Sequence, residues 1–288
     1  MIMMKENNYL SSGNMTENKI NILVTFDKNY INPFRVMIKS LAISNPMETF
    51  HIWLLHSAIP QEDLFALTEY CSKQKITLTA IEIDRELFKN APVSKQYPQE
   101  MYYRMMAPLM LPIGLERVLY LDPDILVINP VRPLWEMQLK NHFFAAASHG
   151  FVLDEFIDEV NKARLGTEHD YFNTGVLLID LKRARTITNA DEIYHCVQEK
   201  AEQLILPDQD VFNCLYGSYT AQIADEIWNY DARYYSAYLL KSEGKIDLDW
   251  VMQNTVFLHF CGKQKPWKNK YSGRFSALYK HYMNLIDK

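Results

Sequence analysis

Apolar and polar positions alternate between strand-like and helix-like patterns in the first third of the chain. Apolar stretches at residues 20–26 and 50–55 predict two buried strands, and alternating positions over residues 75–83 predict a third. Between these strands, apolar groups at helical spacing over residues 31–44 and 60–70 predict two helices. Strands and helices that alternate in this way favour a parallel, doubly wound α/β sheet, which binds ligands beyond the carboxyl ends of its strands.

The rest of the chain continues the same alternation and contains no repeat or linker. Residues 149–170 are polar and irregular, which is typical of a loop or lid. We expect residues 1–19 to form a flexible tail and residues 20–288 to form a single domain. Further strands are expected at residues 118–121, 125–128, 143–148, 174–181, 218–223 and 255–260, and further helices at 101–111, 133–137, 154–162, 190–206, from 207 onward and 275–286.

Composition narrows the possible classes of protein. An apolar fraction of 48% in 288 residues is enough for a large core, and a net charge of −5 argues against non-specific binding to nucleic acid. No apolar run reaches the roughly 18 residues of a membrane span, so we expect a cytoplasmic protein. Four scattered cysteines lack the spacing of a zinc site or disulfide framework and suit a reducing compartment: Cys71, Cys196, Cys214 and Cys261.

Two aspartates stand between apolar runs near the centre of the chain. Asp122 and Asp124 flank Pro123, and side chains two residues apart on an extended backbone point to the same side. Two carboxylates this close repel each other unless a cation or hydrogen bonds offset their charge. A hard divalent ion that also binds substrate phosphates is one solution, and a solvated acidic pair in a polar turn is the other.

Five motifs follow one another along the chain: Val24–Tyr30, Leu119–Val127, Tyr171–Leu181, Leu206–Asn213 and His259–Trp267. Together they resemble glycosyltransferase family 8, whose members are retaining nucleotide-sugar transferases. The resemblance implies a Rossmann-like GT-A fold, with a mostly parallel central sheet and helices on both faces. It also implies transfer of a hexose from UDP-galactose or UDP-glucose to a saccharide acceptor, with retention of anomeric configuration.

The resemblance assigns the first motif to the uridine of the donor. Asp27 and Asn29 can hydrogen-bond the edge of a uracil, Tyr30 can stack on it, and Thr25 is expected beside them. An N-cap pair before the next helix would also explain Asp27 and Asn29. Arg104 is a fixed cation suited to a diphosphate, with a surface salt bridge as the alternative.

The resemblance makes Asp122, Asp124 and His259 the ligands of a metal that bridges the diphosphate. An imidazole ligand favours Mn²⁺, and Mg²⁺ is the second choice. Lys265 would neutralise the leaving UDP, and Gly262 permits close approach of the backbone to a phosphate.

The remaining site residues concern the transferred sugar. Asn173 and Gly175 resemble residues that shape the sugar pocket, and Asp208 would bind sugar hydroxyls, although a helix N-terminus alone also explains it. Gln209 would lie close to the anomeric carbon. Because an amide is a poor nucleophile, the expected mechanism is front-face substitution, in which the leaving phosphate accepts the proton of the acceptor.

Departures from the family pattern concern the acceptor and the surface. Lys28 stands where many relatives carry another polar or acidic residue, and the run 148–150 lacks an aspartate that relatives often place near the acceptor. After Trp267 we expect only a short helix in place of a long basic, aromatic tail. A basic patch in this region fits either a solvated surface or, at most, weak contact with the inner face of the plasma membrane: Lys263, Lys265, Lys268, Lys270 and Arg274.

Other classes of protein explain fewer of these residues. A haloacid-dehalogenase-type phosphatase also has Asp-x-Asp after a strand, but it needs that motif near the start of its domain. A sugar-nucleotide pyrophosphorylase would need a Gly-rich loop where Asp27–Tyr30 stands. Two further interpretations stay open: a sugar-nucleotide-binding protein with lapsed catalysis, and self-glycosylation on one of the 18 tyrosines.

Overall fold

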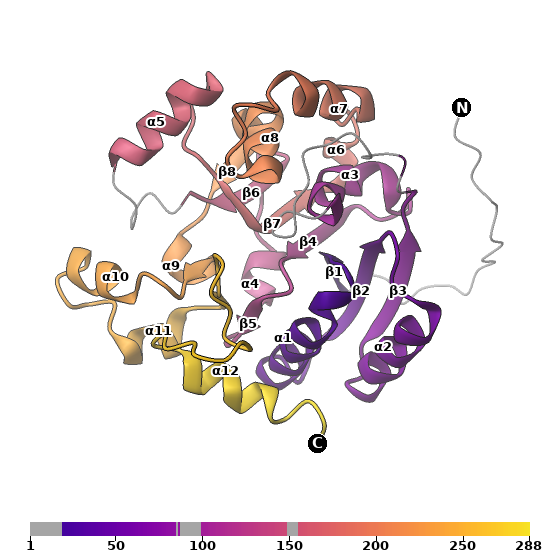
Figure 1. Ribbon diagram of the computed structural model, residues 1–288, viewed down its shortest axis with the longest axis vertical. Coiled ribbons are helices and arrows are strands. Elements are labelled where there is room, and N and C mark those ends of the chain that lie inside the picture. Colours follow the sequence, from indigo (N-terminus) through magenta and orange to yellow (C-terminus); the bar gives the residue numbers. More distant parts are fainter. Residues whose placement is uncertain (1–18, 85, 87–98, 149–154) are drawn as a thin grey trace.

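A seven-stranded sheet forms the centre of the computed structural model, which describes residues 19–84, 86, 99–148 and 155–288. The strand order is β3-β2-β1-β4-β7-β6-β8 (Figure 1). Only β7 runs antiparallel to its neighbours, so the expected α/β class with a mostly parallel central sheet is confirmed. The strands are β1 (Lys19–Thr25), β2 (Thr49–His56), β3 (Thr77–Glu82), β4 (Arg117–Leu121), β6 (Phe144–Ala147), β7 (Asn173–Asp180) and β8 (Thr220–Gln222).

Helices cover both faces of this sheet because its strands are apolar on both sides. Ile22 and Val24 of β1 pack toward α1 (Ile31–Ser44) and α2 (Gln61–Lys73), while Leu23 between them faces the opposite side. The helices on that opposite side are α3 (Tyr103–Met110), α6 (Leu181–Ala184), α7 (Ala190–Glu199) and α8 (Pro207–Tyr216). Continuous apolar strands of this kind are typical of parallel sheets buried on both faces.

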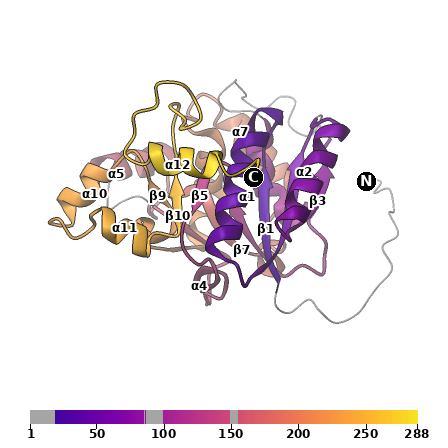
Figure 2. The same ribbon diagram turned by 90° about the horizontal axis from the view of Figure 1, so that it is seen from below.

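A second, three-stranded sheet has the order β5-β10-β9 and lies beside the first. Its strands are β5 (Ile125–Val127), β9 (Tyr230–Asp231) and β10 (Phe257–His259), and a separate apolar cluster joins them to three helices: α10 (Tyr235–Lys241), α11 (Leu248–Asn254) and α12 (Ser276–Met283). The helix α12 lies next to α1 in both views, where Arg35 pairs with Asp287 at 2.8 Å (Figures 1 and 2). The C-terminal end of the chain is thereby attached to the N-terminal half.

Most predicted elements lie near their expected bounds, but two expectations need correction. The helix predicted over residues 190–206 ends at Glu199 and is followed by a turn, and Ile205 and Leu206 donate their N–H groups to the Asp210 carboxylate of the next helix, at 2.7 and 3.1 Å. The backbone at Asp122–Asp124 is a turn and not an extended strand, because β4 and β5 belong to different sheets.

The short remaining elements connect the longer ones: η1 (Lys28–Tyr30), η3 (Gln99–Tyr102), α4 (Arg132–Trp135), α5 (Glu155–Leu165), η4 (Gly217–Tyr219) and α9 (Asp225–Trp228). The expected tail, except residue 19, and the first residues of the expected lid, 149–154, lie outside the described residues. Within the described ranges, no helix has the length and apolar character needed to cross a bilayer.

Candidate metal and sugar-nucleotide site

The topology of the two sheets brings the five motifs to one edge. The carboxyl ends of β1 and β4 meet there, and β7 contributes its N-terminal residues because it is antiparallel to β4. A cleft of about 2180 Å³ opens at this edge. All the residues that the sequence put forward line it: Thr25, Asp27, Asn29, Tyr30, Arg104, Asp122, Asp124, Asn173, Gly175, Asp208, Gln209, His259, Gly262 and Lys265.

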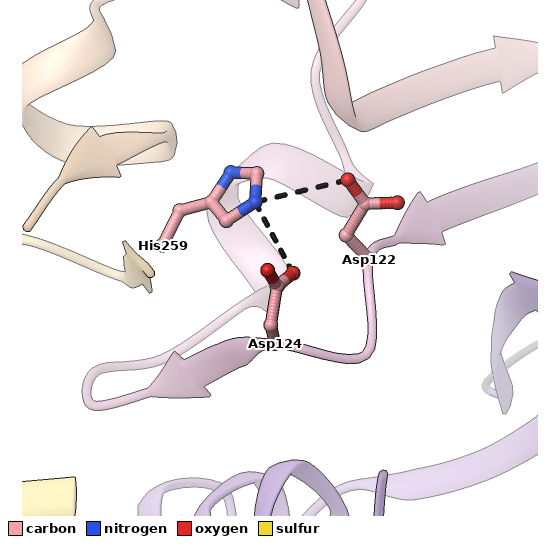
Figure 3. Close-up of side chains that lie close together, drawn as sticks. All are labelled: Asp122, Asp124 and His259. Atoms are coloured by element: carbon pink, nitrogen blue, oxygen red, sulfur yellow. Dashed lines mark ion pairs between the residues drawn. The ribbon is translucent and has the colours of Figure 1, made fainter. Parts of the chain in front are cut away.

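Two carboxylates and one imidazole converge at the centre of this cleft (Figure 3). His259 Nε2 lies 3.2 Å from Asp124 Oδ1 and 3.7 Å from Asp122 Oδ2. The ligand atoms of the three side chains all lie within 4.8 Å of one another. Two oxygen donors and one nitrogen donor at such distances fit a divalent cation, and a mixed oxygen and imidazole set favours a transition metal.

The protein holds one oxygen of each carboxylate and leaves the other facing His259. Tyr120 donates its hydroxyl to Oδ1 of Asp122 at 2.5 Å, and the ammonium of Lys265 pairs with Oδ2 of Asp124. Burial would raise the pKa of Asp124, but Lys265 and His259 outweigh burial and hold this pKa below its usual range. Asp124 is therefore ionised, and both carboxylates are oriented before any cation binds.

The imidazole is oriented by a residue that the sequence analysis missed. Asn229 Oδ1 lies 2.9 Å from His259 Nδ1, which turns Nε2 toward the two aspartates. Asn229 donates in turn to Asn173 Oδ1 at 2.8 Å, and that oxygen also accepts the N–H of Gly175 at 2.9 Å. Hydrogen bonds of this kind fix the orientation of metal-binding histidines. No motif in the sequence marks Asn229.

Arg104 lies buried between two of the carboxylates. Its Nη2 is 3.1 Å from Asp122 Oδ1 and 3.2 Å from Asp208 Oδ2, and its Nη1 donates to the carbonyl of Thr174 at 2.8 Å. Nε donates to the carbonyl of Met101 at 3.0 Å. The alternative of a surface salt bridge is therefore wrong, because the side chain is only 7% exposed. These contacts give Arg104 a role in holding Asp122 and Asp208, and a direct contact with diphosphate stays a prediction.

The N-terminus of α8 presents Asp208 and Gln209 to the cleft, while Asp210 points into the protein. Burial raises the pKa of Asp208, and Arg104 opposes this rise. The Asp210 carboxylate is fully buried and accepts hydrogen bonds from Arg164 at 2.7 and 2.8 Å and from Tyr171 at 2.5 Å. Asp210 therefore has a structural role and does not face the cleft.

The other end of the cleft is built by the residues after β1. Asp27 accepts the backbone N–H of Asn29 and its amide group, both at 2.8 Å, so the N-cap alternative describes a real contact. Tyr30 packs edge-on against Trp267 with ring centroids 5.7 Å apart. Burial and the neighbouring carboxylates raise the pKa of Tyr30 to about 12, so it stays a neutral hydrogen-bonding phenol. Lys28 is exposed and does not line the cleft.

Several known proteins are similar to this chain along most of its length. General stress protein A of Bacillus subtilis is 25% identical over 92% of this chain and 93% of its own length. A lipopolysaccharide 1,2-glucosyltransferase of Escherichia coli is 24% identical over 88% of this chain and 74% of its own length. A lipopolysaccharide 1,3-galactosyltransferase of Salmonella typhimurium is 25% identical over 86% of this chain and 73% of its own length.

A solved structure gives the same fold. The galactosyltransferase LgtC, crystallised with donor and acceptor sugar analogs, superposes with a TM-score of 0.78 at 21% identity, over 93% of this chain and 97% of LgtC. The profile of Glycosyl transferase family 8 matches residues 21–271, which include all five motifs. The chain therefore belongs to glycosyltransferase family 8.

Proposed function

We propose that this glycosyltransferase is a retaining, metal-dependent hexosyltransferase that moves galactose or glucose from a UDP-sugar to a saccharide acceptor. One observation carries the proposal. The free oxygens of Asp122 and Asp124 and Nε2 of His259 face one point in the cleft that Asp208 and Gln209 also line. A diphosphate donor needs a cation at its phosphates and polar groups at its sugar, and the cleft offers both.

The residues after β1 and β10 would bind the nucleotide. Asp27 and Asn29 are exposed enough to hydrogen-bond a uracil, with Tyr30 and Thr25 beside them in the same cleft. Gly262 lines the cleft with a φ of +81°, a left-handed backbone that glycine adopts without strain, and it would lie close to a phosphate. The buried ammonium of Lys265 stands next to the cation site and would share the charge of the diphosphate.

The donor set of Asp122, Asp124 and His259 supports Mn²⁺, with Mg²⁺ as the second choice. A bound divalent cation supplies positive charge that stabilises the diphosphate as it leaves. The protein residues then have two tasks. Arg104 fixes Asp122 and Asp208 relative to each other, and Asn229 fixes the imidazole of His259.

We infer that substitution occurs on the front face of the sugar, because the group expected beside the anomeric carbon is the amide of Gln209, a poor nucleophile. The bond from the anomeric carbon to the UDP oxygen breaks, the bond to the acceptor oxygen forms on the same face, and the acceptor proton moves to the leaving phosphate. Asp208 would bind sugar hydroxyls, Gln209 would lie beside the anomeric carbon, and Asn173 and Gly175 would shape the pocket. Because Asp210 is held by Arg164 and Tyr171, it is not available as a nucleophile. A stable glycosyl adduct on Asp208 or Gln209 would contradict this mechanism.

The acceptor and the place of action belong to the same proposal. Lipopolysaccharide glucosyl- and galactosyltransferases occur among the relatives, which supports a saccharide of the bacterial cell envelope as acceptor. We place the enzyme in the cytoplasm, with at most weak contact with the inner face of the plasma membrane. The phosphatase alternative loses support because β1, β2 and β3 all precede the Asp-Pro-Asp motif.

The test is UDP release by the purified protein with Mn²⁺, using UDP-glucose and UDP-galactose without an acceptor. We expect slow hydrolysis of one donor, reduced about 100-fold or more by Asp124→Asn or His259→Ala, since even indirect partners of metal ligands are worth about 10–100-fold. Asp249→Asn is the matched control, because Asp249 is exposed on α11 and does not line the cleft.

Three other results would change the conclusion. Hydrolysis that persists in both variants would show that Asp124 and His259 are not ligands of the metal. Absence of hydrolysis together with absence of Mn²⁺-dependent UDP binding would refute the proposal. Mn²⁺-dependent UDP binding without hydrolysis, even with added saccharides, would favour a sugar-nucleotide-binding protein with lapsed catalysis.

A further inference from the structure

The cleft is lined by more residues than the proposed donor needs. Beyond the nucleotide, cation and sugar residues, its wall continues along the start of α10 and along the loop between β10 and α12. Besides Lys265, four of the lining residues in these segments are basic, and together they form a cationic rim: Arg233, Lys263, Lys268 and Arg274.

Three of the four rim residues, Lys263, Lys268 and Arg274, lie in a segment of unusual charge. The chain as a whole has a net charge of −5, yet residues 250–286 contain six lysines and arginines and no aspartate or glutamate. A segment of one charge sign in a chain of the opposite sign indicates an interaction with a ligand of complementary charge. The rim is therefore positively charged, although the molecule as a whole is negatively charged.

The carboxylates of the cleft do not neutralise the rim. Asp122 and Asp208 pair with Arg104, and Asp124 pairs with Lys265. Arg233 pairs with Asp231 through Nε and Nη2, which leaves Nη1 against Gly262. Among the residues that the structure describes, Lys263, Lys268 and Arg274 form no ion pair with a carboxylate.

Aromatic rings hold part of the rim in place. The guanidinium of Arg274 lies 4.5 Å from the ring centroid of Tyr235, and Tyr235 packs edge-on against Phe275. An arginine fixed on an aromatic face presents its planar donors to a phosphate or carboxylate at a lower entropy cost than a free side chain. Tyr235 and Tyr271 also line the cleft.

The rim is concave, which distinguishes it from a surface for docking to a bilayer. All six of these basic side chains are exposed, but the four of the rim line the cleft, whereas Lys270 and Lys280 of the same segment do not. Basic side chains around a hollow fit one compact anionic group, while a bilayer surface meets basic residues on a convex face. Charge-assisted hydrogen bonds from Arg and Lys are also the strong contacts that proteins make to phosphates.

We propose that the acceptor is an anionic saccharide whose phosphate or carboxylate group binds at Lys263, Lys268 and Arg274 while its sugar packs near Tyr235 and Tyr271. This inference rests on the proposed function, because it assumes that the inner part of the cleft takes the UDP-sugar. It adds the chemical class of the second substrate, which neither the fold nor the family determines.

The experiment measures saccharide binding to the full chain saturated with Mn²⁺ and UDP, so that the phosphate positions of the donor are filled. Glucose 6-phosphate and glucose are titrated in parallel by calorimetry at two salt concentrations. We expect glucose 6-phosphate to bind about tenfold more tightly than glucose, and this preference to fall as the salt concentration rises.

Two double variants locate the effect. Lys268→Glu with Arg274→Glu reverses two charges of the rim, and we expect it to abolish the preference for glucose 6-phosphate while the affinity for UDP changes less than about twofold. Lys270→Glu with Lys280→Glu makes the same change of charge outside the cleft and should keep the preference.

The outcomes separate this inference from the proposed function. Failure of the unmodified protein to bind UDP with Mn²⁺ would refute the proposed function itself. Normal UDP binding with equal affinities for glucose and glucose 6-phosphate would overturn only the anionic acceptor. Equal losses in both double variants, or a parallel loss of UDP affinity, would also overturn it. If these losses came with binding to phosphatidylglycerol vesicles but not to phosphatidylcholine vesicles, the segment would instead be a membrane-docking surface.

Discussion

Gly175 has no side chain beyond a hydrogen atom, and the imidazole of His259 fills the space where a Cβ would lie. A Cβ on this residue would overlap Cε1 of His259, and it would lie 2.8 Å from Nδ1 of His259 and 3.0 Å from Oδ2 of Asp122. The backbone carbonyl of Gly175 also accepts the N–H of Asp122 at 2.8 Å, so the strand cannot easily move away. Glycine is required here for space and not for a left-handed backbone.

We therefore predict that Gly175→Ala displaces His259 and weakens Mn²⁺-dependent UDP binding by about 10–100-fold, the range seen when partners of metal ligands are lost. Isothermal titration of UDP in the presence of Mn²⁺ measures the effect. Gly114→Ala is the matched control, because a Cβ at Gly114 meets no atom within 4 Å. If Gly175→Ala left the UDP affinity unchanged, binding at the cation site would not depend on the position of His259.

At this scale the sequence located residues but not all of their contacts. Side chains next to strand ends, such as Asp27 and Asp122, could be placed at one edge because parallel strands end together. Asn229 could not, because a single asparagine carries no pattern and its bond to His259 depends on pairing between β9 and β10. Arg104 was assigned to the donor, whereas its buried position between Asp122 and Asp208 depends on how α3 packs on the sheet.

Among the elements, α5 and α8 are joined by one buried ion pair. Arg164 near the end of α5 binds both carboxylate oxygens of Asp210 on α8, at 2.7 and 2.8 Å. Tyr171 and the N–H groups of Ile205 and Leu206 complete the set of donors around Asp210. This network also fixes the first turn of α8, which presents Asp208 and Gln209 to the cleft.

We expect Asp210→Asn to lower the free energy of unfolding by about 3 kcal/mol, because it leaves the Arg164 charge without its partner in a buried setting. Urea unfolding followed by circular dichroism measures this, with Asp249→Asn as the exposed control, for which a change within about 0.5 kcal/mol is expected. The double variant Arg164→Met with Asp210→Asn should recover part of the loss. Additive losses in the double variant would show that the two side chains are not coupled.

Element types were easier to predict from the sequence than element partners. Apolar periodicity placed the strands of the main sheet and the first helices, since local sequence determines both. It also placed strands at residues 125–128 and 255–260, where β5 and β10 lie, but it did not show that they form a second sheet, because their pairing is non-local and the two-residue β9 carries no pattern. Nor did it end α7 at Glu199, because apolar spacing continues into residues 200–206, which form a turn and the capped approach to α8.

The cation site joins the two sheets of the molecule. Asp122 follows β4 of the main sheet, Asp124 precedes β5 of the second sheet, and His259 ends β10, which pairs with β5. A ligand held by all three side chains is therefore held only when both sheets are folded and correctly placed. Binding at this point stabilises the whole described structure rather than one part of it.

The last prediction follows from this linkage. At concentrations about 100 times the dissociation constant, Mn²⁺ with UDP should contribute about 2.7 kcal/mol, which raises the melting temperature by about 5 °C for a chain of this size. The imidazole ligand predicts a smaller rise with Mg²⁺. Differential scanning calorimetry should show one transition that shifts as a unit in the unmodified protein and in Asp249→Asn, and no shift in Asp124→Asn. An equal shift in Asp124→Asn would show that the cation binds at a different site. If the transition were divided and only one part of it shifted, the two sheets would unfold independently.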